Sequence, residues 1–137
     1  MELVAYRPQY HIYLHAASNH ILYKRLEEMT LATELPYYIA DIERALGLVQ
    51  PGFTVLSDLR RTLGPNPQML PVFRQVRQLL QDHGVAMMVE VHPLALSVPK
   101  FMQQVRAQSE DIPTHIFTDI REAEAFLQQF KAQQSLR

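Results

Sequence analysis

Hydrophobic and polar positions alternate one by one near the start of the chain. Over residues 10–16 the side chains divide into Tyr10, Ile12, Leu14 and Ala16 on one side and His11, Tyr13 and His15 on the other. This period of two predicts a β-strand with one face on the core. The turn signal Ser18-Asn19 and a second alternating run over residues 20–25 predict an antiparallel hairpin. A short edge strand over residues 3–6, stopped by Pro8, precedes it.

Further along, apolar positions recur at helical spacing and alternate with short apolar runs. The helices expected from this spacing cover residues 35–46, 69–80, 97–105 and 119–130. The short strands expected between them cover residues 53–56, 85–91 and 114–117. The expected helix caps are Thr33, Ser97 and Asp119 at the beginnings and Gly84 at one end. Asp41 is expected to lie off the buried stripe of its helix.

This order of elements predicts an α/β fold. An antiparallel hairpin is followed by β-α repeats, which call for right-handed crossovers and a largely parallel half of the sheet. The expected architecture is therefore a mixed β-sheet with about four helices. No internal repeat or linker divides the chain, so residues 1–137 are expected to form a single domain. The tail from residue 131 has little to bury and is expected to fray.

Composition narrows the classes of function. The 137 residues are 47% hydrophobic and 20% charged, which is the balance of a globular chain with one core. A formal net charge of -1 offers nucleic acid no general attraction, and no apolar run reaches the roughly 18 residues of a membrane span. The absence of cysteine excludes disulfides and cysteine nucleophiles. No secretory signal begins the sequence, so a cytoplasmic location is expected.

Several short patterns, taken in this order, resemble the SpoIIAA-like, or STAS-type, family. They are the strand FTVLSDLR, a following helix that ends at Gly84, the strand VAMMVEV and the ending IFTDIREAEAFLQQF. The resemblance spans residues 10–130. It implies a SpoIIAA-like mixed sheet with about four helices and a binding or switch module that is not an enzyme. A related branch of the family is similar to lipid-carrying domains.

One departure from the family concerns its phosphorylated serine. Anti-sigma factor antagonists carry that serine at the start of the helix after the central strand, whereas residues 64–68 here read GPNPQ. We therefore expect a regulatory or protein-interaction module without this phospho-switch, with an unidentified protein or a second copy of itself as partner. The alternative is a carrier or sensor that holds a small amphipathic or anionic ligand between helices and sheet. No cofactor is expected.

A charged loop follows the strand that ends at Asp58. The carboxyl ends of strands in open α/β sheets usually carry ligand sites, and a helix N-terminus offers free N–H groups to an anion. The candidate residues for an anionic ligand or an acidic partner surface are Asp58, Arg60, Arg61, Thr62, Asn66, Arg74 and Arg77. The alternative is a solvated loop in which Asp58 caps a turn and the arginines lie at the surface.

Metal binding and acid–base chemistry are less favoured. His11 and His15 share a strand face but lie roughly 13 Å apart at about 3.3 Å per residue, too far for one ion. Glu90 and His92 can share a face of an apolar strand. An enzyme that uses them with Asp58 is the least favoured hypothesis, because no catalytic motif is present.

Tyrosines gather in the first third of the chain. They are Tyr6, Tyr10, Tyr13, Tyr23, Tyr37 and Tyr38. The cluster has three possible explanations: core packing, a dimer face, or a groove for a lipid-like ligand. Exposed tyrosines favour interfaces, so dimerisation is preferred over lipid binding.

Overall fold

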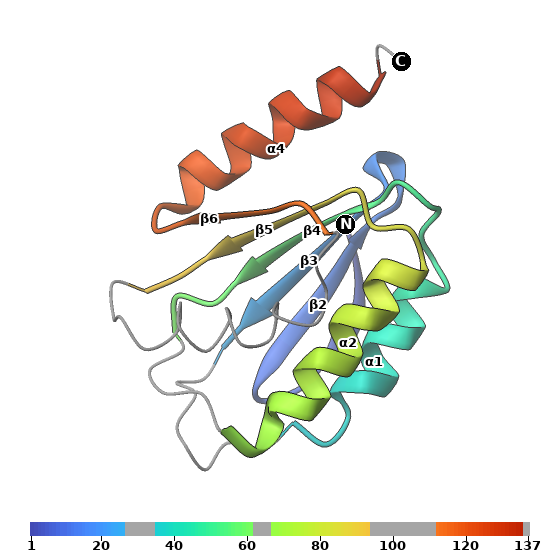
Figure 1. The fold of residues 1–137 in the computed structure, drawn as a ribbon, viewed down its shortest axis with the longest axis vertical. Helices are drawn as coiled ribbons and strands as arrows, with labels where there is room; N and C mark the ends of the chain where they lie inside the picture. Colours follow the sequence, from blue (N-terminus) through green and yellow to red (C-terminus); the bar gives the residue numbers. More distant parts are fainter. Residues whose placement is uncertain (27–34, 62–66, 94–111, 136–137) are drawn as a thin grey trace.

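A computed structural model describes residues 1–26, 35–61, 67–93 and 112–135. Its described strands form one mixed sheet of six, and their order in the sheet follows their order in the chain (Figure 1). The antiparallel part consists of β1 (Glu2–Tyr6), β2 (Tyr10–His15) and β3 (His20–Arg25). The parallel part adds β4 (Thr54–Asp58), β5 (Met87–Val91) and β6 (Thr114–Phe117) beside β3. The predicted mixed α/β sheet with its N-terminal hairpin is therefore confirmed.

Three α-helices lie within the described residues. They are α1 (Tyr38–Leu46), α2 (Leu70–Asp82) and α4 (Ile120–Ser135), accompanied by the 3-10 turns η1 (Ala16–Ser18) and η2 (Pro67–Met69). The helix expected over residues 97–105, which would make four, lies outside the described part of the chain. The α1 helix begins three residues later than expected, because Pro36 precedes it and Tyr37 is its N-cap, without a capping side chain.

The helices cover the two faces of the sheet unequally. The buried side chains of α1 and α2 join those of β2, β3 and β4 in the larger core, so both helices lie on one face. Consecutive right-handed crossovers in a sheet that grows in one direction place helices in this way. On the other face, α4 contacts β5 and β6, with Ala123 and Leu127 buried against Val89 and Val91. The part of that face formed by β1 and β2 has no described helix over it (Figure 1).

The last helix continues beyond the point where the tail was expected to fray. It extends to Ser135 because polar side chains attach it to distant turns. Lys131 Nζ donates to the carbonyl oxygens of Ser18 and Asn19, and Gln134 Nε2 donates to that of Gly52 at 3.2 Å. The expectation of fraying considered only apolar burial and not these backbone acceptors, and fraying of the tail stays a prediction.

The main departure from the expected burial pattern is Asp41 on α1. Expected off the buried stripe, its side chain is fully buried. Its carboxylate accepts hydrogen bonds from Arg7 at 2.9 and 3.0 Å, from the Tyr10 hydroxyl at 2.6 Å and from Arg44 at 2.6 Å. Burial alone would raise the pKa of Asp41, but these donors outweigh it and hold the pKa below its ordinary value. The network joins α1 to the hairpin.

Candidate functional site

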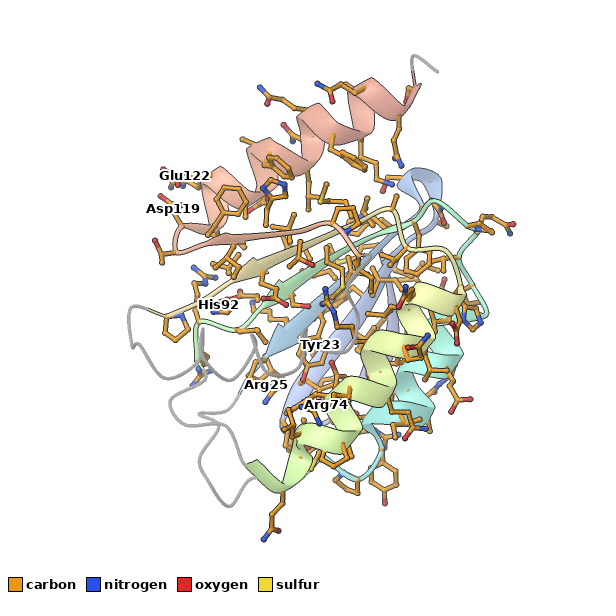
Figure 2. The ribbon with its side chains drawn as sticks, in the orientation of Figure 1. Tyr23, Arg25, Arg74, His92, Asp119 and Glu122 are labelled. Atoms are coloured by element: carbon orange, nitrogen blue, oxygen red, sulfur yellow. The ribbon has the colours of Figure 1, made fainter. Side chains whose placement is uncertain are left out.

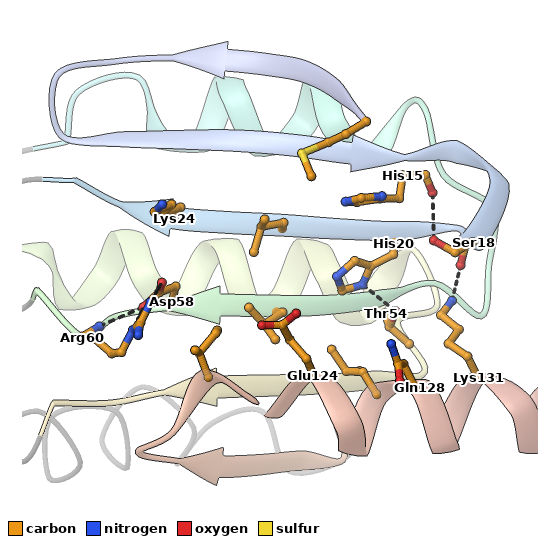
Figure 3. Close-up of a pocket in the computed structure, with 15 residues that line it drawn as sticks. His15, Ser18, His20, Lys24, Thr54, Asp58, Arg60, Glu124, Gln128 and Lys131 are labelled. Carbon is orange, nitrogen blue, oxygen red and sulfur yellow. Dashed lines mark hydrogen bonds and ion pairs between the residues drawn. The ribbon is translucent and has the colours of Figure 1, made fainter. Parts of the chain in front are cut away.

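A groove of about 600 Å³ lies between α4 and the neighbouring strands of the sheet (Figure 3). It forms because α4 contacts β5 and β6 and leaves the α4-side face of β3 accessible from the side. The middle of the groove has apolar walls, formed by Leu22 and Leu56 from the sheet and by Ile120 and Leu127 from α4. Glu124 of α4 adds one carboxylate between the two ends (Figure 3). Most polar lining side chains gather towards its two ends, which makes the groove amphipathic along its length.

The first end lies where β3 and β4 begin. There His20 Nδ1 and Thr54 Oγ1 are 2.7 Å apart, and the His15 ring lies beside the His20 ring with 5.9 Å between centroids. Lys131 reaches this end from α4 and donates to the carbonyl oxygens of Ser18 and Asn19. Figure 3 shows these side chains at one end of the groove.

The electrostatics of this end keep His20 uncharged near neutral pH. Burial, followed by the positive charges of Lys131 and His15, lowers the pKa of His20 from 6.5 to about 4. Burial also lowers the pKa of Lys131. In a neutral ring one nitrogen donates and the other accepts, so His20 can hold Thr54 with one and present the other to the groove.

The second end lies where the same strands finish. Asp58 accepts two hydrogen bonds from the Arg60 guanidinium, at 2.9 Å from Nε and 2.8 Å from Nη2, and a third from the Arg60 backbone N–H at 3.3 Å. Burial would raise the pKa of Asp58, but Arg60 and then Lys24 outweigh it and lower the pKa. Lys24 lies directly across from Asp58 on β3. It makes no hydrogen bond or ion pair within the described part of the chain.

The structure does not bring the predicted loop residues into one patch. Asp58 and Arg60 line the groove, whereas Arg61 is exposed and does not. Arg77 is buried on the opposite side of the sheet, where it donates to Thr114 Oγ1 at 2.8 Å. Arg74 lies one turn earlier on that same helix and is half-buried. Thr62 and Asn66 lie outside the described residues, and binding by the described members stays a prediction.

The rule that suggested this loop does not apply to the observed strand order. Open α/β sheets form a ligand crevice where the strand order reverses. The described strands follow one another across the sheet without a reversal. The groove instead owes its position to α4, which crosses to the face opposite α1 and α2.

A second polar cluster lies on the α1 and α2 side of the sheet. His92 Nε2 and Glu90 Oε1 are 2.9 Å apart, and both side chains are almost completely buried. Tyr23 and Arg25 on β3 are also buried on this face, and Figure 2 places Tyr23, Arg25 and His92 near the carboxyl ends of the strands. His92 Nδ1 has no hydrogen-bond partner within the described residues.

The acid–base hypothesis that joined this pair to Asp58 is wrong. The strand register pairs Glu90 with Ser57 and Val91 with Asp58. Alternate residues of a strand point to opposite faces, so Asp58 points away from Glu90 and His92. The Glu90–His92 pair itself was correctly expected to share one face.

The tyrosines divide between the core and the surface. Tyr10, Tyr23 and Tyr38 pack against one another, with ring centroids 5.3 to 5.6 Å apart, and Tyr38 also contacts Phe73 edge-on. Tyr6 is 70% exposed on the edge strand β1, and Tyr37 is exposed beside Arg7. Core packing therefore explains half of the cluster, Tyr6 and Tyr37 lie at the surface, and Tyr13 is half-buried on β2.

Sequence reasoning missed most residues that line the groove. His15 on β2, and His20 and Lys24 on β3, could have been found from the sequence, because alternation along each strand places them on the face opposite the core. No sequence pattern could have placed Glu124 and Lys131 in the groove, because the side of the sheet that α4 covers depends on tertiary packing.

Comparison with protein-family models, with curated proteins and with solved structures finds no match to the chain. Within the described ranges, no three His, Asp or Glu side chains are placed to hold a metal ion. Among the same residues, none of the helices has the length and apolar character to cross a membrane. The functional argument therefore depends on the geometry of the chain itself.

Proposed function

We propose that the protein is a non-enzymatic binding module that holds a small amphipathic ligand in the groove between α4 and the sheet. The observation that carries this proposal is a groove of about 600 Å³ with largely apolar walls and with most of its polar side chains at the two ends. Ligand sites in proteins have this size and combine apolar walls with a few polar groups. A carrier or sensor role in the cytoplasm is part of the proposal.

The experiment is a fluorescence titration with Nile red, a neutral apolar dye, supported by native mass spectrometry of the purified protein. Leu22→Trp places a large ring on the floor of the groove and should abolish the dye signal. Leu3→Trp is the matched control, because Leu3 lies on β1, is half-exposed and does not line the groove. Failure of the wild-type protein to bind the dye, or equal binding by the two variants, would refute the proposal.

A second candidate is the protein-interaction module that the STAS-type resemblance implies. It is favoured by Leu3 and Tyr6, which are 48% and 70% exposed on the edge strand β1. A free strand edge with an exposed aromatic side chain is suited to pairing with another chain. A dimer mass in the same native spectrum, without a bound small molecule, would favour this candidate over the ligand carrier.

A further inference from the structure

The groove has a lysine at each end of its apolar middle. Lys24 lies at the carboxyl end of β3, and Lys131 approaches the amino end from α4 (Figure 3). The third lining cation, Arg60, is engaged by both carboxylate oxygens of Asp58. The Asp58–Arg60 pair is therefore neutral, and Glu124 and Asp119 also act on Arg60 from the side of α4. Lys24 is the lining cation at this end that has no ion-pair partner within the described residues.

The amino end also carries a positive charge, because Lys131 lines it and makes no ion pair within the described residues. Lys131 Nζ donates to the two carbonyl oxygens of Ser18 and Asn19. An ammonium group has three donors, so one remains. Carbonyl groups do not neutralise the charge, and after burial it is the charge of Lys131 that lowers the pKa of His20 most. An anion at this end would relieve the positive potential.

The two ends have a fixed separation along the strand. Their positions differ by four residues, from His20 to Lys24, which at about 3.3 Å per residue is roughly 13 Å. Leu22 and Leu56 form the floor between them. Glu124 lines the groove from α4 and makes no hydrogen bond or ion pair within the described part of the chain. Its carboxylate disfavours a second negative charge near it in the middle of the groove.

We propose that the ligand is an extended α,ω-dicarboxylate, with one carboxylate at Lys24, the other at Lys131 and an apolar chain over Leu22 and Leu56. This inference rests on the proposed function of the groove. It goes further because it specifies two negative ends, whereas an amphipathic ligand in general needs only one polar end.

The first test compares three compounds of equal chain length as competitors of Nile red: sebacate, decanoate and decanediol. Each partly exposed ion pair contributes up to about five-fold in affinity, so sebacate should bind about five-fold more tightly than decanoate, and decanediol more weakly still. Lys24→Gln should reduce sebacate to the level of decanoate. Arg121→Gln removes an equal charge from an exposed position of α4 outside the groove and should leave the ranking unchanged.

The second test measures His20 by NMR titration and needs no variant. Sebacate should raise the pKa of His20 above about 4, because a carboxylate beside Lys131 offsets the charge that lowers it. Decanediol should leave this pKa unchanged. If the dye binds but sebacate, decanoate and decanediol displace it equally, the dicarboxylate inference is wrong and the groove function remains. If the dye does not bind the wild-type protein, the proposed function itself fails.

Discussion

Stability below neutral pH should depend on His20. The pKa of its imidazole is 6.5 in the unfolded chain and about 4 in the folded one. The pKa of His20 is lower in the folded chain than in the unfolded one. The contribution of neutral His20 to the free energy of unfolding is therefore fully present above pH 6.5 and is lost as the pH falls towards 4. Between about pH 7 and about pH 5 the unfolded chain takes up a proton that the folded chain does not. Linkage then predicts a loss of about 2 kcal/mol in the free energy of unfolding.

Urea denaturation at several pH values measures this loss. The wild-type protein is compared with the variant His20→Asn. The amide of this side chain can still hydrogen-bond the Thr54 hydroxyl but does not titrate. The wild-type protein should lose about 2 kcal/mol more than the variant over this interval. Asp41 and Asp58 do not confuse the comparison, because both have a pKa below the ordinary 3.8 and titrate at lower pH. Equal pH slopes in the two proteins would refute the reasoning.

Two further predictions concern the scaffold. Asp41→Asn removes the buried charge that accepts hydrogen bonds from Arg7, Tyr10 and Arg44. It should lower the free energy of unfolding, measured by chemical denaturation, by about 2 kcal/mol. A change within experimental error would show that the network contributes little to stability. Gly84→Ala should lower the melting temperature more than Gly52→Ala. Both glycines have positive φ, but only at Gly84 would a Cβ meet another residue, Pro51 Cβ at 3.2 Å; equal losses would mean that the contact has no cost.

Local patterns predicted the elements of the fold well. Alternation over residues 10–25 indicated the hairpin, and the left-handed conformation of Gly84 follows from its place after α2. Asp119 Oδ1 accepts from the Arg121 N–H at 2.8 Å, as expected of a helix cap. Each of these features depends on neighbours in the chain, which is why the sequence was sufficient for them.

The groove could not be predicted in the same way. Its location depends on which face of the sheet α4 covers and on how much of that face it leaves open. The amphipathic stripe of α4 is compatible with either face, so periodicity does not decide between them. Asp41 illustrates the same limit, because its burial depends on Arg7 and Tyr10, which are distant in the chain. Hydrogen bonds between residues that are distant in the chain cannot be predicted from local hydrophobic periodicity.

The strand order also has a consequence for synthesis of the protein. Each described strand pairs with the one before it, so the sheet can grow strand by strand as the chain leaves the ribosome. The contact of Lys131 with Ser18 spans 113 positions and forms only after the C-terminal helix has emerged. A nascent or truncated chain that lacks this helix can therefore contain most of the sheet without the groove, because α4 forms one of its walls.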